Sequence, residues 1–178
     1  MRVLQRSFYA RNTGVVAKQL LGKYLIRKIA GRKLVGKIVE TEAYFQDDPA
    51  SHSFKGKTPR SAPMFEEPGH AYVYFIYGAH YCFNAVTEKS GKAGAVLIRA
   101  LEPVSGIKLA TNGPGKLTRA LMIDKKSNRA DLTKGNLVIA EGKSEKLKIV
   151  MTGRIGISKA SKRLFRFYLK DNKFVSRP

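Results

Sequence analysis

The chain has 178 residues, with 34 lysines and arginines against 13 aspartates and glutamates, so its formal net charge is +21. This length fits one domain that buries a hydrophobic core without disulfide or metal support. Such an excess of positive charge favours a polyanionic partner, nucleic acid first and an anionic membrane surface second. A membrane is disfavoured because the longest mainly apolar run, residues 71–79, is too short to span one, and residues 1–6 do not lead into the apolar stretch of a signal peptide.

Cysteine and histidine are scarce in this sequence. One cysteine, Cys82, excludes an intramolecular disulfide and a Cys-rich zinc site, and its aromatic neighbours indicate a buried small hydrophobe. Three histidines occur (His52, His70 and His80) without an HExxH motif, which argues against zinc hydrolases and zinc deaminases. We therefore expect no metal and no cofactor, and a reducing compartment, the cytoplasm, together with the DNA.

The first third of the chain predicts a helix followed by a β-hairpin. Thr13 is a candidate cap for a helix whose apolar residues recur at helical spacing and which ends near Gly22. Residues 23–29 and 33–41 predict two strands, joined by a short turn at residues 30–32.

The second of these strands carries acidic residues where a strand interior normally avoids them. Because side chains alternate along a strand, Glu40, Glu42 and Tyr44 share one face if the strand continues to residue 44. One interpretation is that the strand end reaches solvent, where a carboxylate costs little. The other is a general base beside an aromatic wall. On this stretch alone the first interpretation is slightly favoured.

Residues 45–70 form a long segment rich in Pro, Gly, Ser and charge. A loop of this length in a compact domain is usually functional or disordered. Its apolar residues Phe54, Met64 and Phe65 favour an ordered loop.

The rest of the chain predicts short strands, one further helix and a basic tail. Strands are expected at residues 71–77, 81–87, 95–101, 137–140 and 147–150. Arg99 lies within an apolar strand and needs a partner, because an unpaired buried charge is very costly. A glycine-rich turn opens a short helix at residues 112–122; it suits a phosphate, but by itself it is equally explained as a simple helix cap. The basic and aromatic residues 163–170 are interpreted as a solvated face with some phosphate contact. No repeat, linker or domain boundary is visible, so residues 1–178 are expected to be a single domain.

Five segments occur in a fixed order along the chain: V-E-T-E-A-Y, S-H-S-F-K-G-K-T-P-R, P-G-H-A-Y-V-Y-F-I-Y-G-A-H-Y-C-F-N, L-I-R-A-L-E-P and G-P-G-K-L. This series resembles the 3-methyladenine (alkyladenine, methylpurine) DNA glycosylase family, from the first helix to at least Met122. The resemblance implies an α+β fold, a single compact mixed domain with a curved antiparallel β-sheet flanked by short helices. It also implies a monomeric, monofunctional enzyme that flips damaged (alkylated or deaminated) purines out of double-stranded DNA. A glutamate-activated water then hydrolyses the N-glycosidic bond and starts base excision repair.

The resemblance also assigns roles to individual residues. It implies that Glu42 is the general base, that Arg99 helps hold the water and the carboxylate, and that Asn84 forms the pocket floor. The remaining matches are the base-enclosing walls and the wedge that enters the duplex: Tyr44, His52 and Tyr74 for the walls and Tyr77 for the wedge.

Several basic and aromatic residues have more ordinary interpretations. Lys55 and Arg60 in the long loop and Lys116 at the glycine-rich turn are expected to contact DNA phosphates. Tyr72 is interpreted as a core tyrosine. Ala79, beside the wedge, stands where some members of the family carry a bulkier apolar residue, so a smaller contact with the opposite strand is expected there.

Two alternatives have different mechanisms. A nucleic-acid-binding module without catalysis explains the charge and the aromatic strands, but not Glu42 and Arg99 at the ends of apolar strands. A bifunctional glycosylase-lyase needs a lysine nucleophile in the pocket, and no lysine stands at position 42, although the many lysines elsewhere leave this alternative open. Borohydride trapping on damaged DNA separates it from a water-based reaction.

Overall fold

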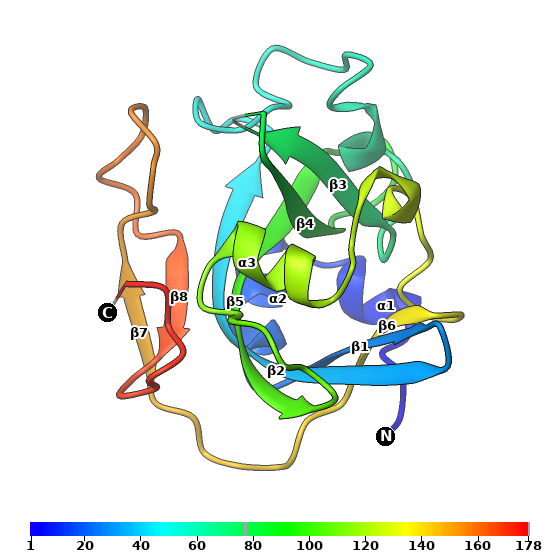
Figure 1. The fold of residues 1–178 in the computed structure, drawn as a ribbon. Coiled ribbons are helices and arrows are strands. Elements are labelled where there is room, and N and C mark those ends of the chain that lie inside the picture. Colours follow the sequence, from blue (N-terminus) through cyan, green and yellow to red (C-terminus); the bar gives the residue numbers. More distant parts are fainter. Residues whose placement is uncertain (77, 178) are drawn as a thin grey trace.

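The computed structural model describes residues 1–76 and 78–177 (Figure 1). Tyr77, the expected wedge, lies outside the described residues. An antiparallel, eight-stranded sheet runs in the order β3-β4-β5-β2-β1-β6, and β8 joins β7 to β2. The sheet is curved and carries a few short helices, so the predicted α+β class is confirmed.

The strands are β1 (Tyr24–Ile29), β2 (Arg32–Phe45), β3 (Ala71–Ile76), β4 (His80–Val86), β5 (Gly94–Ser105), β6 (Leu137–Ala140), β7 (Ile149–Thr152) and β8 (Arg166–Leu169). The helices are α1 (Arg6–Tyr9), α2 (Thr13–Leu20) and α3 (Pro114–Ala120), with the 3-10 helices η1 (Ala62–Phe65) and η2 (Lys125–Ser127). The predicted strands are present, and β2 continues past the acidic residues to Phe45. Among residues 1–76 and 78–177, no helix is long and apolar enough to cross a membrane.

β2 is the strand that the other elements are built around. β5 pairs along one of its edges from Val35 to Phe45, whereas β1 pairs with residues 32–37 and β8 with residues 40–42. The β2–β5 register shifts on both sides of Glu40. Such irregularities bend a strand and increase its twist, which explains how the sheet curves at this point and why β2 exchanges one partner for another.

The two faces of the sheet have different environments. The core face of β2 and β5 carries Val39, Ala43 and Ile98, which lie in one buried cluster with Val16 and Leu20 of α2. α2 packs against β2 and β5, and α3 against β4 and β5. Because alternate residues point to opposite faces, the positions between these core residues are available to build a site on the other face.

Three predictions about local structure were wrong. Asn12 rather than Thr13 caps α2, since the Asn12 Oδ1 accepts from the N–H groups of Gly14 and Val15. The Thr13 hydroxyl instead donates to Glu88 at 2.8 Å. Phe54 is 47% exposed and does not anchor the long loop, whereas Met64 is buried.

The third error concerns the C-terminal basic segment. It was expected to be a solvated face, but Arg166 and Phe167 are 5% and 2% exposed. Arg166 is buried because its Nε donates to Glu40 at 2.7 Å, a pairing across 126 positions that the local pattern does not reveal.

Candidate active site

A cavity of about 560 Å³ opens on the face of the sheet opposite α2. Its walls come from alternate residues of β2, β3, β4 and β5, from the long loop, from the start of α3 and from the segment after β7. The described lining residues include Tyr44, Ala50, Ser51, His52, Met64, Tyr72, Tyr74, Ile76, His80, Cys82, Asn84, Ala95, Leu97, Arg99, Gly113, Pro114, Gly115, Lys116, Arg119, Ile155, Gly156 and Ile157. A cavity of this size is typical of a site for a small ligand or a single base.

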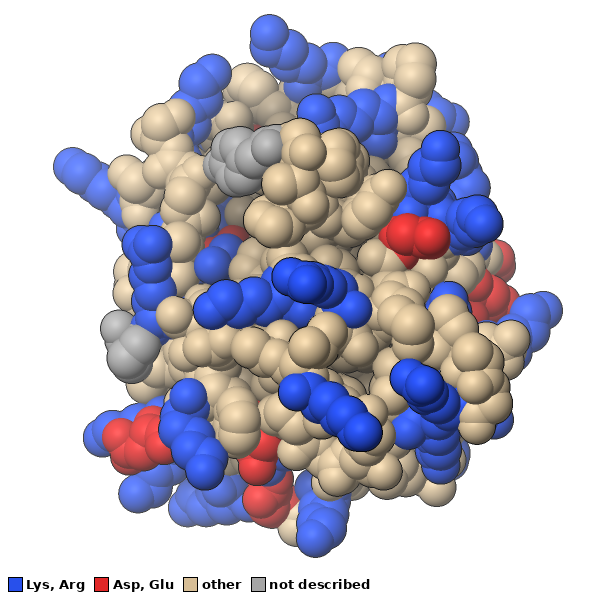
Figure 2. All heavy atoms as spheres, viewed as in Figure 1, with Lys and Arg blue, Asp and Glu red and all other residues tan. Residues whose placement is uncertain are grey.

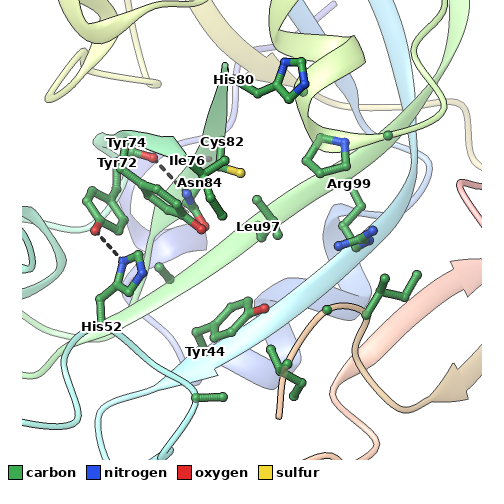
Figure 3. Close-up of a pocket in the computed structure, with 18 of the residues that line it drawn as sticks. Tyr44, His52, Tyr72, Tyr74, Ile76, His80, Cys82, Asn84, Leu97 and Arg99 are labelled. Carbon is green, nitrogen blue, oxygen red and sulfur yellow. Dashed lines mark hydrogen bonds between the residues drawn. The ribbon is translucent and has the colours of Figure 1, made fainter. Parts of the chain in front are cut away.

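One wall of the cavity is aromatic (Figure 3). The His52 ring lies edge-on to Tyr74, with 4.6 Å between ring centroids, and Tyr72 lies 5.1 Å from Tyr74. The His52 Nδ1 and the Tyr72 hydroxyl form a 2.8 Å hydrogen bond. Burial, and then the charge of Arg60, lower the pKa of His52 to about 4. The imidazole is therefore neutral at pH 7 and has one nitrogen left over from its bond to Tyr72.

The floor of the cavity comes from β4 and β5. Asn84 is opposite Tyr72 on β3 and opposite Leu97 on β5. Its Nδ2 donates to the carbonyl of Tyr72 at 3.0 Å, which fixes the rotation of the amide. Burial raises the pKa of the Cys82 thiol, so this side chain is a neutral part of the floor.

Glu42 lies directly behind the cavity wall and has no exposed surface. Its carboxylate accepts from the Tyr44 hydroxyl at 2.9 Å and from the Ile155 N–H at 2.8 Å, and Arg99 Nη1 lies 3.4 Å away. All three of these partners line the cavity. Burial raises the pKa of Glu42, although Arg99 and the two hydrogen bonds oppose the shift. The same burial, together with the Glu42 charge, raises the pKa of Tyr44, so its phenol remains a donor.

Glu40 has a different environment on the same face. Its carboxylate accepts from Nε of Arg99 at 3.1 Å and from Nε of Arg166 at 2.7 Å, and also from the backbone N–H and the hydroxyl of Ser176. Both glutamates therefore contact Arg99, which confirms that they share a face. The interpretation of a solvent-exposed strand end is wrong, since neither carboxylate is exposed.

The mouth of the cavity is basic. Lys116 and Arg119 line it from α3, and the Arg60 guanidinium lies 5.4 Å from the Tyr74 ring centroid. Lys55 is exposed on the long loop but does not line the cavity. Figure 2 shows Lys and Arg side chains scattered across this view and around its edge among other side chains, with fewer Asp and Glu side chains.

The comparisons with known proteins agree with this geometry. Residues 7–173 match the family model described as methylpurine-DNA glycosylase. A protein of Carboxydothermus hydrogenoformans named "Putative 3-methyladenine DNA glycosylase" is 52% identical over 98% of this chain and 99% of its own length. Proteins with the same name from Legionella pneumophila (strain Corby) and Clostridium tetani are 50% and 45% identical, over 99% and 98% of this chain and 100% and 98% of their own lengths. The chain belongs to the methylpurine-DNA glycosylase family.

The structure brings most of the expected residues of this DNA glycosylase to one place. Tyr44, His52, Tyr74, Asn84 and Arg99 line the same cavity, with Glu42 behind them. Tyr72 is 2% exposed, as expected of a core tyrosine, but it also lines the cavity. In the part of the chain that the structure describes, no group of three or more His, Cys, Asp and Glu residues is placed to hold a metal ion.

Sequence reasoning did not single out Arg154 and Asp48. Their side chains form a fully buried ion pair beside Tyr44, and the Arg154 guanidinium lies 4.6 Å from the Tyr44 ring centroid. The pair joins residues 106 positions apart, and neither residue stands in a periodic pattern. A signal was present in the glycines on both sides of Arg154 and Ile155: an added Cβ at Gly153 would lie 3.1 Å from the carbonyl oxygen of Ser161, and Gly156 has a φ of +74°, which glycine adopts without strain.

Proposed function

We propose that this glycosylase flips alkylated and deaminated purines out of double-stranded DNA and hydrolyses their N-glycosidic bond with a water activated by Glu42. The observation that carries the proposal is a buried carboxylate, held by Arg99, Tyr44 and the Ile155 N–H, at the wall of an aromatic cavity of about 560 Å³. A base inside a duplex hides its glycosidic bond, so the nucleotide must leave the stack before the reaction, at a cost of a few kcal/mol.

The aromatic wall is suited to an extruded purine. Stacking on aromatic faces contributes roughly 1–3 kcal/mol per base. Alkylation at a ring nitrogen makes a purine cationic, and a cation over an aromatic face gains further attraction. Neutral His52 and the fixed amide of Asn84 add hydrogen-bonding groups that read the edge of the base.

The proposed chemistry follows from the electron flow. As the bond from C1′ to the base nitrogen breaks, the base takes the bonding electrons and the sugar carbon becomes positive. The oxygen of water forms the new bond to C1′ while Glu42 takes its proton, and the carboxylate also stabilises the positive sugar. Positioned proton transfer of this kind contributes on the order of 10²–10⁴ in rate. The raised pKa of Glu42 makes its carboxylate a better proton acceptor than an exposed one.

Duplexes that each carry one defined lesion test the proposal. With 7-methylguanine, hypoxanthine or ethenoadenine at the labelled position, incubation followed by alkali should break the strand at the lesion, and an undamaged duplex should stay intact. Absence of breakage on every lesion would refute the proposal.

Borohydride trapping tests the lyase alternative. Lys116 lines the cavity mouth, with its Nζ 3.2 Å from Asn112 Oδ1, so a lysine is within the region of the site. A water-based reaction predicts no trapped complex between the enzyme and damaged DNA. A trapped complex that disappears in the Lys116→Gln variant would assign a lyase step to this residue.

A further inference from the structure

Two irregular segments that line the cavity, residues 50–52 and 155–157, are joined behind its wall by the Arg154–Asp48 ion pair. Arg154 Nη2 donates to Asp48 Oδ1 at 3.0 Å, and Nη1 donates to Asp48 Oδ2. Nη1 also donates to the carbonyl of Ala43 at 3.0 Å. Ala43 is the residue between Glu42 and Tyr44, so one guanidinium fixes both segments to the strand that carries the carboxylate.

Each residue of the ion pair lies next to a part of the site. Asp48 is in the turn that precedes His52, and Arg154 directly precedes Ile155. On one side, Asp48 Oδ1 accepts from the Ala50 N–H at 3.1 Å and the Asp48 carbonyl from the Ser51 N–H at 2.8 Å, which shapes the turn before His52. On the other side, Arg154 immediately precedes Ile155, whose N–H donates to Glu42 Oε1 at 2.8 Å.

The Arg154–Asp48 ion pair is better suited to fixing the positions of the two segments than to stabilising the fold. A buried ion pair costs a large desolvation energy, and an apolar pair of the same volume is often as stable. Arginine offers a planar fork that binds a carboxylate through two parallel bonds, whereas lysine offers a point charge. Arg154 uses this fork on Asp48 and stacks its guanidinium on the Tyr44 ring, 4.6 Å from the centroid.

We infer that Arg154, together with Asp48, is a positioning residue for base excision that holds the Ile155 N–H against Glu42 and closes the cavity wall between residues 50–52 and 155–157. The inference rests on the proposed role of Glu42 as the general base. A loss of this placement changes the geometry of the reaction without removing a group that touches the base.

The groups around Glu42 determine how the loss of this placement changes the pH dependence of excision. Arg99 faces it from β5, Tyr44 and Glu40 from β2, and the Ile155 amide from the segment after β7. Arg166 of β8 is opposite Glu42 in the strand register, but its Nε donates to Glu40. The Ile155 hydrogen bond lowers the pKa of Glu42, so its loss raises that pKa further. The acid limb of the pH-rate profile then moves to higher pH.

Arg154→Lys is the main test, because it keeps the charge and loses the fork. Single-turnover excision from a hypoxanthine duplex is measured from acidic to mildly alkaline pH, with the thermal midpoint of each variant. The expected result is a roughly 10²-fold slower rate at neutral pH, as displaced catalytic groups produce, with the acid limb at higher pH. Asp48→Asn should give the same shift.

Asp131→Asn is the matched control. It breaks the 2.8 Å ion pair between Arg6 and Asp131, which does not line the cavity, and should lower the midpoint without moving the pH profile. If Arg154→Lys does not fold, the neutral double variant Asp48→Asn/Arg154→Gln replaces it, with the same readouts. A variant of the pair with a lowered midpoint, but a wild-type profile and wild-type rate per folded molecule, would overturn the inference.

Glu42→Gln separates the two levels of the argument. If it excises at the wild-type rate, the proposed function fails and the inference fails with it. If it is inactive while the Arg154→Lys profile matches wild type, the inference alone fails.

Discussion

Glu40 and Glu42 lie two positions apart on the same face of β2, yet their hydrogen-bond partners differ. The Glu40 carboxylate accepts hydrogen bonds from the Nε groups of Arg99 and Arg166 and from the N–H and hydroxyl of Ser176. Its oxygens are therefore occupied by strong donors. Glu42 has one guanidinium at the longer distance of 3.4 Å, and its other donors belong to residues that line the cavity. Because the oxygens of Glu40 are filled by these donors, whereas the partners of Glu42 line the cavity, the geometry favours Glu42 as the base and Glu40 as a partner that places Arg99.

The first prediction concerns this pair of carboxylates. Glu42→Gln should retain binding to damaged duplex and slow single-turnover excision on the order of 10²–10⁴-fold, because it removes the base and keeps the shape. Glu40→Gln should be milder in excision and should lower the thermal midpoint, because Arg166 is then buried beside a neutral group. The opposite ranking of the two excision rates would transfer the role of base to Glu40.

The second prediction concerns Arg99 and pH. Burial raises the pKa of Glu42 above the ordinary glutamate value of about 4.3, and Arg99 is the strongest group that opposes this shift. In the proposed mechanism excision needs the carboxylate, so activity should fall as the pH drops through the raised pKa. Arg99→Gln removes the opposing charge, and the acid limb should move to higher pH than in wild type. Single-turnover rates over a pH series measure the shift, and an unmoved limb would contradict the assignment of that limb to Glu42.

The stability that Glu42 contributes depends on pH in the opposite direction to activity. Since the folded pKa of Glu42 is raised, the folded state binds more protons than the unfolded state between the unfolded and folded pKa values. The contribution of Glu42 to stability is therefore present below the unfolded pKa and is lost as the pH rises through the folded pKa. The buried charge that the proposed reaction requires thus makes the fold less stable at neutral pH.

At the scale of elements, the sequence predicts where a strand lies better than it predicts which strands and side chains pair with it. The period-two pattern of β2 was enough to place Glu40, Glu42 and Tyr44 on one face, because alternation is a local property of an extended chain. The pattern does not say that β8 pairs with β2, or that Arg154 meets Asp48, since these contacts join distant positions. The burial of Arg166 was missed for the same reason. The order of motifs in the family, rather than local physics, linked His52 and Asn84 to Glu42.

The third prediction concerns the segment that follows β8. Ser176 donates from its N–H at 2.7 Å and from its hydroxyl at 2.9 Å to Glu40, so this segment covers the carboxylate from the side of β8. Ser176→Ala removes the hydroxyl bond to Glu40, and the 3.4 Å bond that Arg99 Nη2 donates to the same hydroxyl, and leaves the backbone bond. The free energy of unfolding should fall by roughly 1.5–3 kcal/mol, the range for a hydrogen bond to a charged group. Denaturant unfolding measures it, with exposed Ser158→Ala as a control that should stay unchanged.

At the scale of the whole molecule, several of the few acidic side chains are neutralised locally. Glu66 pairs with Arg129 at 2.8 Å, Glu67 with Arg6 at 3.3 Å and Glu141 with Lys23 at 2.6 Å. The charges of Glu66 and Glu67 in the long loop are therefore balanced by arginines beside them. The surplus Lys and Arg side chains are spread over the view in Figure 2, which suits a partner that is charged along its length.

The last prediction concerns how this surplus binds DNA. Affinity for undamaged duplex should fall linearly with salt on logarithmic axes, with a slope of about −0.9 for each phosphate that the protein neutralises. Replacing Lys55, Arg60 and Lys116 by Gln should make the slope shallower by about 0.9 for each lost contact. Equilibrium binding to a labelled duplex over a salt series measures both slopes.

The control for this experiment removes the same charge from another place. Lys143, Lys146 and Lys148 are exposed in the loop between β6 and β7, which Figure 1 shows at the opposite end of the molecule from the long loop. If phosphate contacts at the cavity mouth set the slope, replacing these three lysines by Gln should leave it nearly unchanged. Equal changes in both triple variants would mean that net charge alone determines binding. A flat titration of the wild-type protein would contradict DNA binding through phosphates altogether.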